Sequence, residues 1–228
     1  HIMVVDTDAY WAMGDCELCG PGCDINGQPP LCNANLDPCD TTMGAGVIFP
    51  AGKDSSARRC DLAAGRYVTY KDPDPVAAFL CTAKVGSGGG GGTPADAMVA
   101  ALSWPLLGTN GYPTGCNQGF LRDDALLVVT IISDTTDDKS SGPAEAWRKA
   151  LLDAKNQDGD AFQLLVITTD LDVGGLCGPY EGFLNRLRTF VEIVPHGLIG
   201  SVCADSYGPF FELAVADILE RCDSFVPQ

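Results

Sequence analysis

The stretch from Ala125 to Asp138, with the sequence ALLVVTIISDTTDD, constrains the fold of this chain more than any other segment. Its apolar and β-branched run stops abruptly at Ser133 and Asp134. The run is too short to cross a membrane and too rich in β-branched residues to favour a helix. A continuous apolar run is typical of a central strand that is buried on both faces of a parallel sheet. We therefore expect Asp134 at the carboxyl edge of such a sheet, where ligands of α/β proteins usually bind.

The segments after this strand alternate between helical and strand patterns. Gly142 opens a predicted helix that reaches about Lys155, and Gln163 to Asp170 (QLLVITTD) is a second buried strand. The other predicted elements are strands at 2–6, 46–49, 66–70 and 191–194 and helices at 76–81, 94–102, 180–190 and 206–222. Alternating strands and helices predict an α/β fold, with a mostly parallel central sheet and helices on both faces.

Residues 14–62 differ in composition from the rest of the chain. They are rich in Cys, Gly, Pro, Asn and Asp and show no apolar period. Such a stretch cannot build a hydrophobic core of its own, so covalent cross-links must hold it. We therefore interpret residues 1–228 as a single domain that carries a disulfide-rich irregular insertion at 14–62.

The chain has 11 cysteines, and their density indicates disulfides formed in an oxidising compartment: extracellular, cell-surface or periplasmic. An odd count leaves at least one cysteine without a partner in the same chain. Cys177 with Cys203 is the long-range pair that we expect. A zinc site is the alternative for the cysteines in the insertion, although their spacing is not that of a common zinc ribbon. The candidate zinc ligands are Cys16, Cys19, Cys23, Cys32 and Cys39.

The formal net charge of −16 argues against binding to nucleic acid or to anionic membrane surfaces. No segment is long and apolar enough for a transmembrane helix, so we expect no membrane insertion. No signal peptide is visible. His1 to Val5 already has the pattern of a strand, which leads us to expect that the segment is cut from a longer precursor.

Three features fall where strands end or a helix begins. Two of them are Asp6-x-Asp8-x-Tyr10, near the N-terminus, and Asp134, after the apolar run. The remaining feature is Thr93, which follows a glycine-rich run from residue 86 to 92. Because Pro94 comes next, Thr93 has the pattern of an N-cap before a proline at the first helical position. The alternative without a ligand site is that the glycine run is only a flexible linker and that the aspartates only cap turns or helices. Together, however, the oxygen donors suit Mg²⁺, Ca²⁺ or Mn²⁺.

This combination resembles the von Willebrand factor A (vWA) domain with its metal-ion-dependent adhesion site. Asp6-Thr7-Asp8-Ala9-Tyr10, Gly92-Thr93-Pro94 and Ile132-Ser133-Asp134 stand at the three positions of that motif. Residues 117–127 (NQGFLRDDALL) add a likeness to cysteine-rich, secreted bacterial versions of the domain, such as those of myxobacteria. The resemblance implies a Rossmann-like vWA fold, with Asp6, Asp8, Thr93 and Asp134 as metal ligands.

One departure from the family pattern changes what the ion is expected to do. Asp8 and Tyr10 stand where the family has two serines. Three carboxylates, from Asp6, Asp8 and Asp134, would hold a cation more firmly and leave it less able to attract an acidic partner. We therefore expect a structural ion, Ca²⁺ rather than Mg²⁺ because Ca²⁺ accommodates extra carboxylates, with an empty site as the alternative.

The resulting hypothesis is a secreted or cell-surface, non-enzymatic adhesion module that binds a protein or a surface polymer. The alternative is a structural subunit that self-assembles outside the cell through disulfides and strand contacts. A third hypothesis, a metal-dependent hydrolase, would use Asp134 and Asp137. No Gly-x-Ser-x-Gly elbow is present, His196 follows a proline in a predicted loop, and no phosphate-loop lysine follows the glycine run, so we expect no enzyme.

Overall fold

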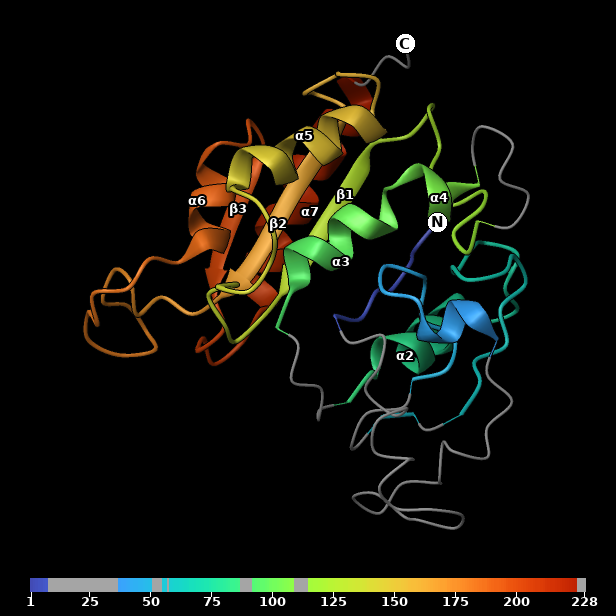
Figure 1. Cartoon of the computed structure of the whole chain (residues 1–228), viewed down its shortest axis with the longest axis horizontal. Helices are drawn as coiled ribbons and strands as arrows, with labels where there is room; N and C mark the ends of the chain where they lie inside the picture. The colour runs from blue at the N-terminus through green and yellow to red at the C-terminus, as the bar shows by residue number, and fades with distance from the viewer. Residues whose placement is uncertain (8–36, 51–54, 57, 87–91, 109–114, 225–228) are drawn as a thin grey trace. The chain divides into compact units, whose positions relative to one another are not determined.

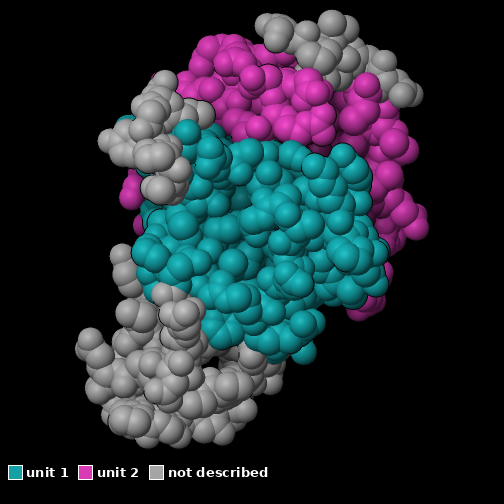
Figure 2. All heavy atoms as spheres, turned by 90° about the vertical axis from the view of Figure 1, so that its right-hand side faces the viewer, with its two compact units in different colours: residues 1–91, 96–120 teal, residues 92–95, 121–228 magenta. Residues whose placement is uncertain are grey.

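The computed structural model describes residues 1–7, 37–50, 55–56, 58–86, 92–108 and 115–224 (Figure 1). The chain divides into two compact units, which Figure 2 colours separately. Unit 1 comprises His1–Gly91 and Asp96–Phe120, and unit 2 comprises Gly92–Ala95 and Leu121–Gln228.

Unit 2 is built on a parallel sheet of three strands in the order β1-β2-β3. The strands are β1 (Leu127–Ile132), β2 (Phe162–Thr168) and β3 (Gly197–Ser201). Leu127 lies opposite Phe162, and Leu164 lies opposite Gly197, so the three carboxyl ends meet at one edge. The predicted α/β architecture with parallel strands is confirmed at this level.

Helices cover both faces of this sheet. They are α5 (Ala144–Ala154), α6 (Arg186–Glu192) and α7 (Gly208–Ser224), and Figure 1 shows α7 behind the strands. Two glycines of β3 identify the faces, because side chains alternate along a strand. A Cβ at Gly197 would meet Val191 of α6, whereas a Cβ at Gly200 would meet Phe210 of α7. Both glycines therefore allow a helix to approach β3 closely.

The core of unit 2 is centred on β2, whose seven residues are all buried. Trp147 of α5 packs edge-on against Phe190 of α6, with ring centroids 5.5 Å apart. Both rings are almost fully buried, as is Leu151 on the same face of α5. These side chains join the two helices over one face of the sheet.

The expectation that the run from Ala125 forms a central strand is wrong in one respect. β1 is a strand, but among the described strands it pairs with β2 alone and lies at an edge. Val128, Thr130 and Ile132 point to one face and are all exposed. Their face is the one that α7 covers over β3, and the cover does not extend to bury β1.

The prediction for residues 180–194 also needs correction. The helix begins only at Arg186, because the Asn185 side chain caps it by accepting hydrogen bonds from the amides of Leu187 and Arg188. Val191 belongs to that helix, and the strand expected at 191–194 lies instead at β3. Val191 is β-branched and therefore favours a strand, but here its side chain is buried on the inner face of a short helix.

The described residues of unit 1 form few regular elements. It contains the short helix η3 (Pro38–Thr41), α2 (Pro75–Ala83), α4 (Trp104–Leu107) and most of α3 (Pro94–Ala101), which begins in unit 2. The strands expected at 2–6, 46–49 and 66–70 are reduced to isolated antiparallel bridges, Ile2 with Val68 and Val5 with Gly46. The described part of the predicted insertion, from residue 37 onward, is therefore mainly irregular, as its composition indicates.

Three disulfides link the described residues: Cys39–Cys116, Cys60–Cys81 and the predicted Cys177–Cys203. Their presence supports folding in an oxidising compartment. Cys39 is therefore not a zinc ligand, and Cys16, Cys19, Cys23 and Cys32 lie outside the described residues. Among the described cysteines, Cys222 is free and exposed. In the part of the chain that the structure describes, no helix could span a membrane.

The close approach of α6 to β3 gives a first testable prediction. In Gly197→Ala, the new methyl group would lie 2.5 Å from the Val191 carbonyl oxygen and 2.7 Å from its Cγ1 atom. We expect a loss of about 1–3 kcal/mol in the free energy of unfolding, measured by urea denaturation. Gly159→Ala is the control, since its nearest neighbour would be 4.0 Å away. Equal stability of the two variants would contradict this packing.

Candidate functional site

The carboxyl edge of the sheet in unit 2 gathers three loops, at 133–143, 169–185 and 202–207. Residues 92–95 join the same edge, where α3 begins (Figure 1). This arrangement provides the edge at which α/β sheets usually bind ligands. It also contains two of the predicted metal ligands, Thr93 and Asp134.

Thr93 is half-buried and directly precedes α3, as the N-cap pattern predicts. The amide of Ala95, in the first turn, donates a hydrogen bond of 3.0 Å to Oδ2 of Asp137. A Cβ at Gly92 would be 3.7 Å from the Thr135 hydroxyl oxygen. The segment that carries Thr93 is therefore fixed against the loop that follows β1.

Asp137 is fully buried, and both of its carboxylate oxygens are used. Oδ2 accepts from Ala95, and Oδ1 accepts from the amide of Ser140 at 3.1 Å. The Asp137 carbonyl accepts a 2.8 Å hydrogen bond from the Arg186 guanidinium. Its role is to organise the loop, whereas the neighbouring Asp138 is exposed.

Asp134 is exposed just past the end of β1. No described residue donates a hydrogen bond to its carboxylate or forms an ion pair with it. The hydroxyl groups of Ser133 and Thr135 flank it in sequence and lie 3.0 Å apart. This part of the edge thus offers one carboxylate and several hydroxyl oxygens. Among the described residues, no three His, Cys, Asp or Glu side chains are grouped closely enough to hold a metal ion.

The other two predicted ligands are placed differently. Asp6 belongs to unit 1, where it follows the bridge between Val5 and Gly46 and is half-buried. Asp8 lies outside the described residues. Thr93 and Asp134 therefore share one unit, and the complete set of four ligands stays a prediction from the sequence.

Asp6 lines a small pocket in unit 1 whose volume is about 40 Å³. The pocket also contacts Asp40, Arg66 and the backbone around Gly46. A space of this size accommodates a few water molecules or an ion and is too small for an organic substrate. The surroundings of Asp6 within unit 1 therefore include a cationic group, the guanidinium of Arg66.

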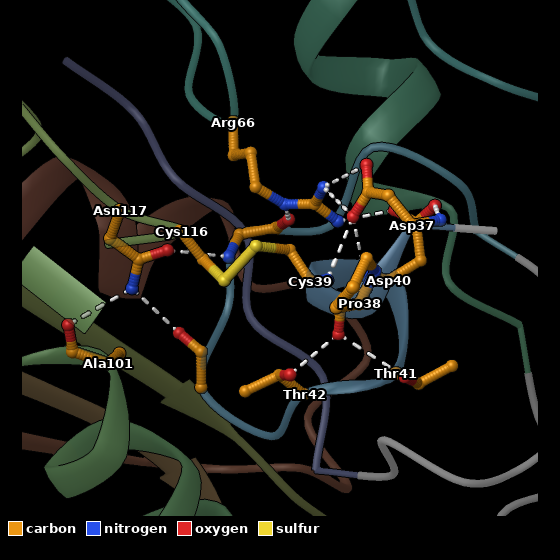
Figure 3. Close-up of a disulfide and its surroundings, with 12 residues drawn as sticks. Asp37, Pro38, Cys39, Asp40, Thr41, Thr42, Arg66, Ala101, Cys116 and Asn117 are labelled. Atoms are coloured by element: carbon orange, nitrogen blue, oxygen red, sulfur yellow. Dashed lines mark hydrogen bonds and ion pairs between the residues drawn. A yellow bond between two sulfur atoms is a disulfide. The ribbon is translucent and has the colours of Figure 1, made fainter. Parts of the chain in front are cut away.

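Arg66 organises this pocket (Figure 3). Its guanidinium is largely buried and donates to the Gly46 carbonyl at 2.7 Å, to Asp40 at 2.5 Å and to Asp37 at 3.2 Å. Arg59 donates to the second oxygen of Asp40 at 2.6 Å. Because each aspartate faces an arginine, the cluster is close to neutral and has the character of a structural ion network.

The pKa of Asp40 reflects this network. Burial by itself raises the pKa of the carboxyl group, but hydrogen bonds from Arg66 and Arg59 outweigh it, and the pKa is lowered overall. Asp40 also completes the capping box of η3, where the amides of Asp37 and Asp40 each bond to the other residue's side chain. The carboxylate therefore stays ionised and engaged.

Asn117 is a buried polar residue beside the Cys39–Cys116 disulfide (Figure 3). Its amide nitrogen donates to the carbonyls of Gly44 and Ala101, and its oxygen accepts from the Gly46 amide at 2.9 Å. It holds the backbone that lines the pocket. In the sequence, Asn117 stands out only as part of the family resemblance at 117–127. Its structural role could not be predicted, because its hydrogen-bond partners are distant along the chain.

Asp170 is a further structural carboxylate, and no sequence motif singles it out. It follows β2 and accepts hydrogen bonds from the amides of Leu176 and Cys177, at 2.7 and 2.8 Å. Burial raises its pKa, but these amides and the Ser201 hydroxyl outweigh that effect, and the pKa is lowered. The position at a strand end is the signal that could have drawn attention to it.

The remaining candidate groups have ordinary partners. His196 lies in a loop, as predicted, and forms a hydrogen bond of 2.9 Å with Asp160. Arg122 forms a two-pronged ion pair with Asp124. Neither arrangement positions a nucleophile beside a base.

Comparison with known proteins finds no counterpart of this chain. No family model matches its sequence, and neither a curated protein nor a solved structure resembles it significantly.

The ion network in unit 1 gives a second prediction. Arg66→Met would leave Asp40 buried beside a single arginine, so we expect a loss of about 3 kcal/mol in the free energy of unfolding. The control is Arg122→Met, which breaks an exposed ion pair and should change the stability much less. Chemical denaturation measures both. Similar losses in the two variants would show that the buried network contributes no special stability.

The lowered pKa of Asp40 gives a prediction for acid unfolding. Because the pKa is lower in the folded state, its stabilising contribution is complete above the unfolded value of about 3.9 and is lost as the pH falls through the folded value. We therefore expect Asp40→Asn to flatten the decline in stability below about pH 4. Urea denaturation at several pH values tests this; parallel declines in the wild type and the variant would contradict it.

Proposed function

We propose that this chain is a vWA-like, non-enzymatic binding module of the extracellular space or cell surface, with a divalent-cation site at the carboxyl edge of its sheet. One observation carries the proposal. Asp134 presents an exposed carboxylate at the end of β1, without a partner among the described residues, on the edge where the Thr93 segment is fixed by Asp137. The carboxyl edge of a parallel sheet is where α/β proteins usually bind their ligands.

The donor chemistry fits a hard cation. Thr93, Ser133, Asp134 and Thr135 offer only oxygen atoms, which suit Ca²⁺ and Mg²⁺ and disfavour zinc or copper. With one carboxylate in this group, water molecules would complete the shell. Ca²⁺ accepts such irregular coordination more readily than Mg²⁺, which requires a regular octahedron, so we favour Ca²⁺.

The non-enzymatic part of the proposal is supported by the state of the nearby carboxylates. A hydrolase built on Asp134 and Asp137 needs both groups accessible to an ion or a water molecule. Asp137 is buried, and its two oxygens are occupied by backbone amides. The partner in this proposal is a protein or a surface polymer.

Cation binding can be tested by thermal unfolding in Ca²⁺, in Mg²⁺ and in chelator. A ligand that binds only the folded state adds about 2.7 kcal/mol at a hundredfold excess over its Kd, so we expect Ca²⁺ to raise the melting temperature by several degrees. Asp134→Ala and Thr93→Ala should reduce that shift. Asp123→Ala, an exposed aspartate before β1, should retain it.

An unchanged melting temperature in saturating Ca²⁺ and Mg²⁺ would remove the cation from the proposal. A shift that persists in Asp134→Ala would move the site elsewhere in the chain.

A second function, as a disulfide-linked subunit of an extracellular assembly, is favoured by Cys222. Its thiol is free of described partners and exposed on α7, and the total of 11 cysteines is odd. Electrophoresis without reductant would then show dimers or larger species that Cys222→Ser removes. A monomer in the oxidised wild type would argue against it.

A further inference from the structure

The loop between β2 and α6, residues 171–184, exposes five large apolar side chains at the carboxyl edge of the sheet. It is the orange segment that extends from this edge in Figure 1. The exposed fractions are 58% for Val173, 69% for Leu176, 67% for Tyr180, 36% for Phe183 and 71% for Leu184. Single exposed apolar residues are common, but several on one short loop are typical of an interaction surface.

The backbone of the loop is organised around a buried carboxylate, that of Asp170. The Asp170 carboxylate occupies the interior, where it accepts the amides of Leu176 and Cys177. A Cβ at Gly175 would collide with that carboxylate, so the backbone must pass close to it. The backbone at Leu176 thus turns around a carboxylate, and the Leu176 side chain is exposed.

The loop is held in one conformation by several independent bonds. Cys177 is linked to Cys203 in the neighbouring loop, and the Glu181 amide donates to the Leu171 carbonyl at 3.0 Å. Asp172 forms a two-pronged ion pair with Arg188 of α6, at 2.6 and 3.2 Å. A surface fixed before binding loses little conformational entropy on association, which favours affinity.

The charge around these apolar residues is negative. Glu181, on the loop, and Asp205, beside the disulfide, are exposed and have no partner among the described residues. The neighbouring cations are already engaged: Arg188 binds Asp172, and Arg186 donates to three backbone carbonyls. With a net charge of −16 for the whole chain, a partner with basic groups is complementary and an anionic membrane is not.

We propose that the 171–184 loop is a docking surface for a protein segment that combines apolar and basic side chains. Leu176, Tyr180 and Leu184 supply the apolar contacts, and Glu181 with Asp205 supplies the charge. This surface goes beyond the proposed cation site, because none of its groups needs an ion to be in place.

The experiment uses the full oxidised chain and a short, acetylated, fluorescent peptide of alternating leucine and lysine. Binding is followed by fluorescence anisotropy, once in Ca²⁺ and once in chelator. We expect the peptide to bind in both conditions, and matched peptides with glutamate for lysine or serine for leucine to bind much more weakly. Leu176→Ser and Leu184→Ser should each weaken binding about tenfold.

Leu213→Ser provides the matched control, because Leu213 is also strongly exposed, at 61%, but lies on α7. It should leave the affinity unchanged, and all three substitutions should fold because the replaced side chains are exposed. Glu181→Gln should weaken binding a few-fold and reduce its dependence on salt.

Each of the following outcomes would overturn the proposal. The first is no binding, or equal binding by all variants. The second is equal binding of the leucine-glutamate peptide. The third is sedimentation of the chain with uncharged phosphatidylcholine vesicles that depends on Leu176 and Leu184, which would assign the loop to a membrane surface instead. Loss of peptide binding only in chelator would contradict independence from the cation site.

Discussion

The buried carboxylate of Asp137 is the contact on which the candidate site depends. It accepts one amide from the first turn of α3 and one from its own loop, and its backbone carbonyl is held by Arg186 of α6. A carboxylate is stable in this position because backbone amides replace its lost hydration. Its position near the start of α3 also agrees with the favourable interaction between a negative charge and a helix N-terminus. Through this one residue, the segment with Thr93 is fixed on the edge that carries Asp134.

A second buried carboxylate fixes a loop of unit 2 in the same way. Asp170, at the end of β2, binds two amides of the 171–184 loop, as Asp137 does for the loop after β1. In both cases the carboxylate that fixes the loop is buried, while the groups that could meet a ligand are exposed. They are Asp134 on one loop and the apolar side chains on the other. The edge therefore combines rigid loops with two chemically different surfaces, one polar and one mainly apolar.

Much of the fold of unit 2 could be predicted from local patterns, because α5 and α7 have a helical periodicity and β2 is a mainly apolar run that is buried along its whole length. The apolar run at β1 showed a strand but could not show how many neighbours it has, so its edge position was missed. Within the candidate site, the positions of Thr93 and Asp134 beside the start of α3 and the end of β1 could be predicted from local patterns, whereas their role as metal ligands stays a prediction. The roles of Asp137, Asp40 and Asn117 could not be predicted, since their partners lie 42, 26 and 71 residues away. Contacts of that range follow from tertiary structure and leave no local signal.

The most direct test of this account is hydrogen–deuterium exchange at the Ala95 amide in the wild type and in Asp137→Ala. If Asp137 fixes the start of α3, Ala95 and Ser140 will be protected in the wild type and will exchange much faster in the variant, while the amides of β2 stay protected. Any Ca²⁺ response of the wild type should weaken in the same variant, although Thr93 and Asp134 are unchanged. Equal exchange of Ala95 in the two proteins would show that the carboxylate does not hold this edge together.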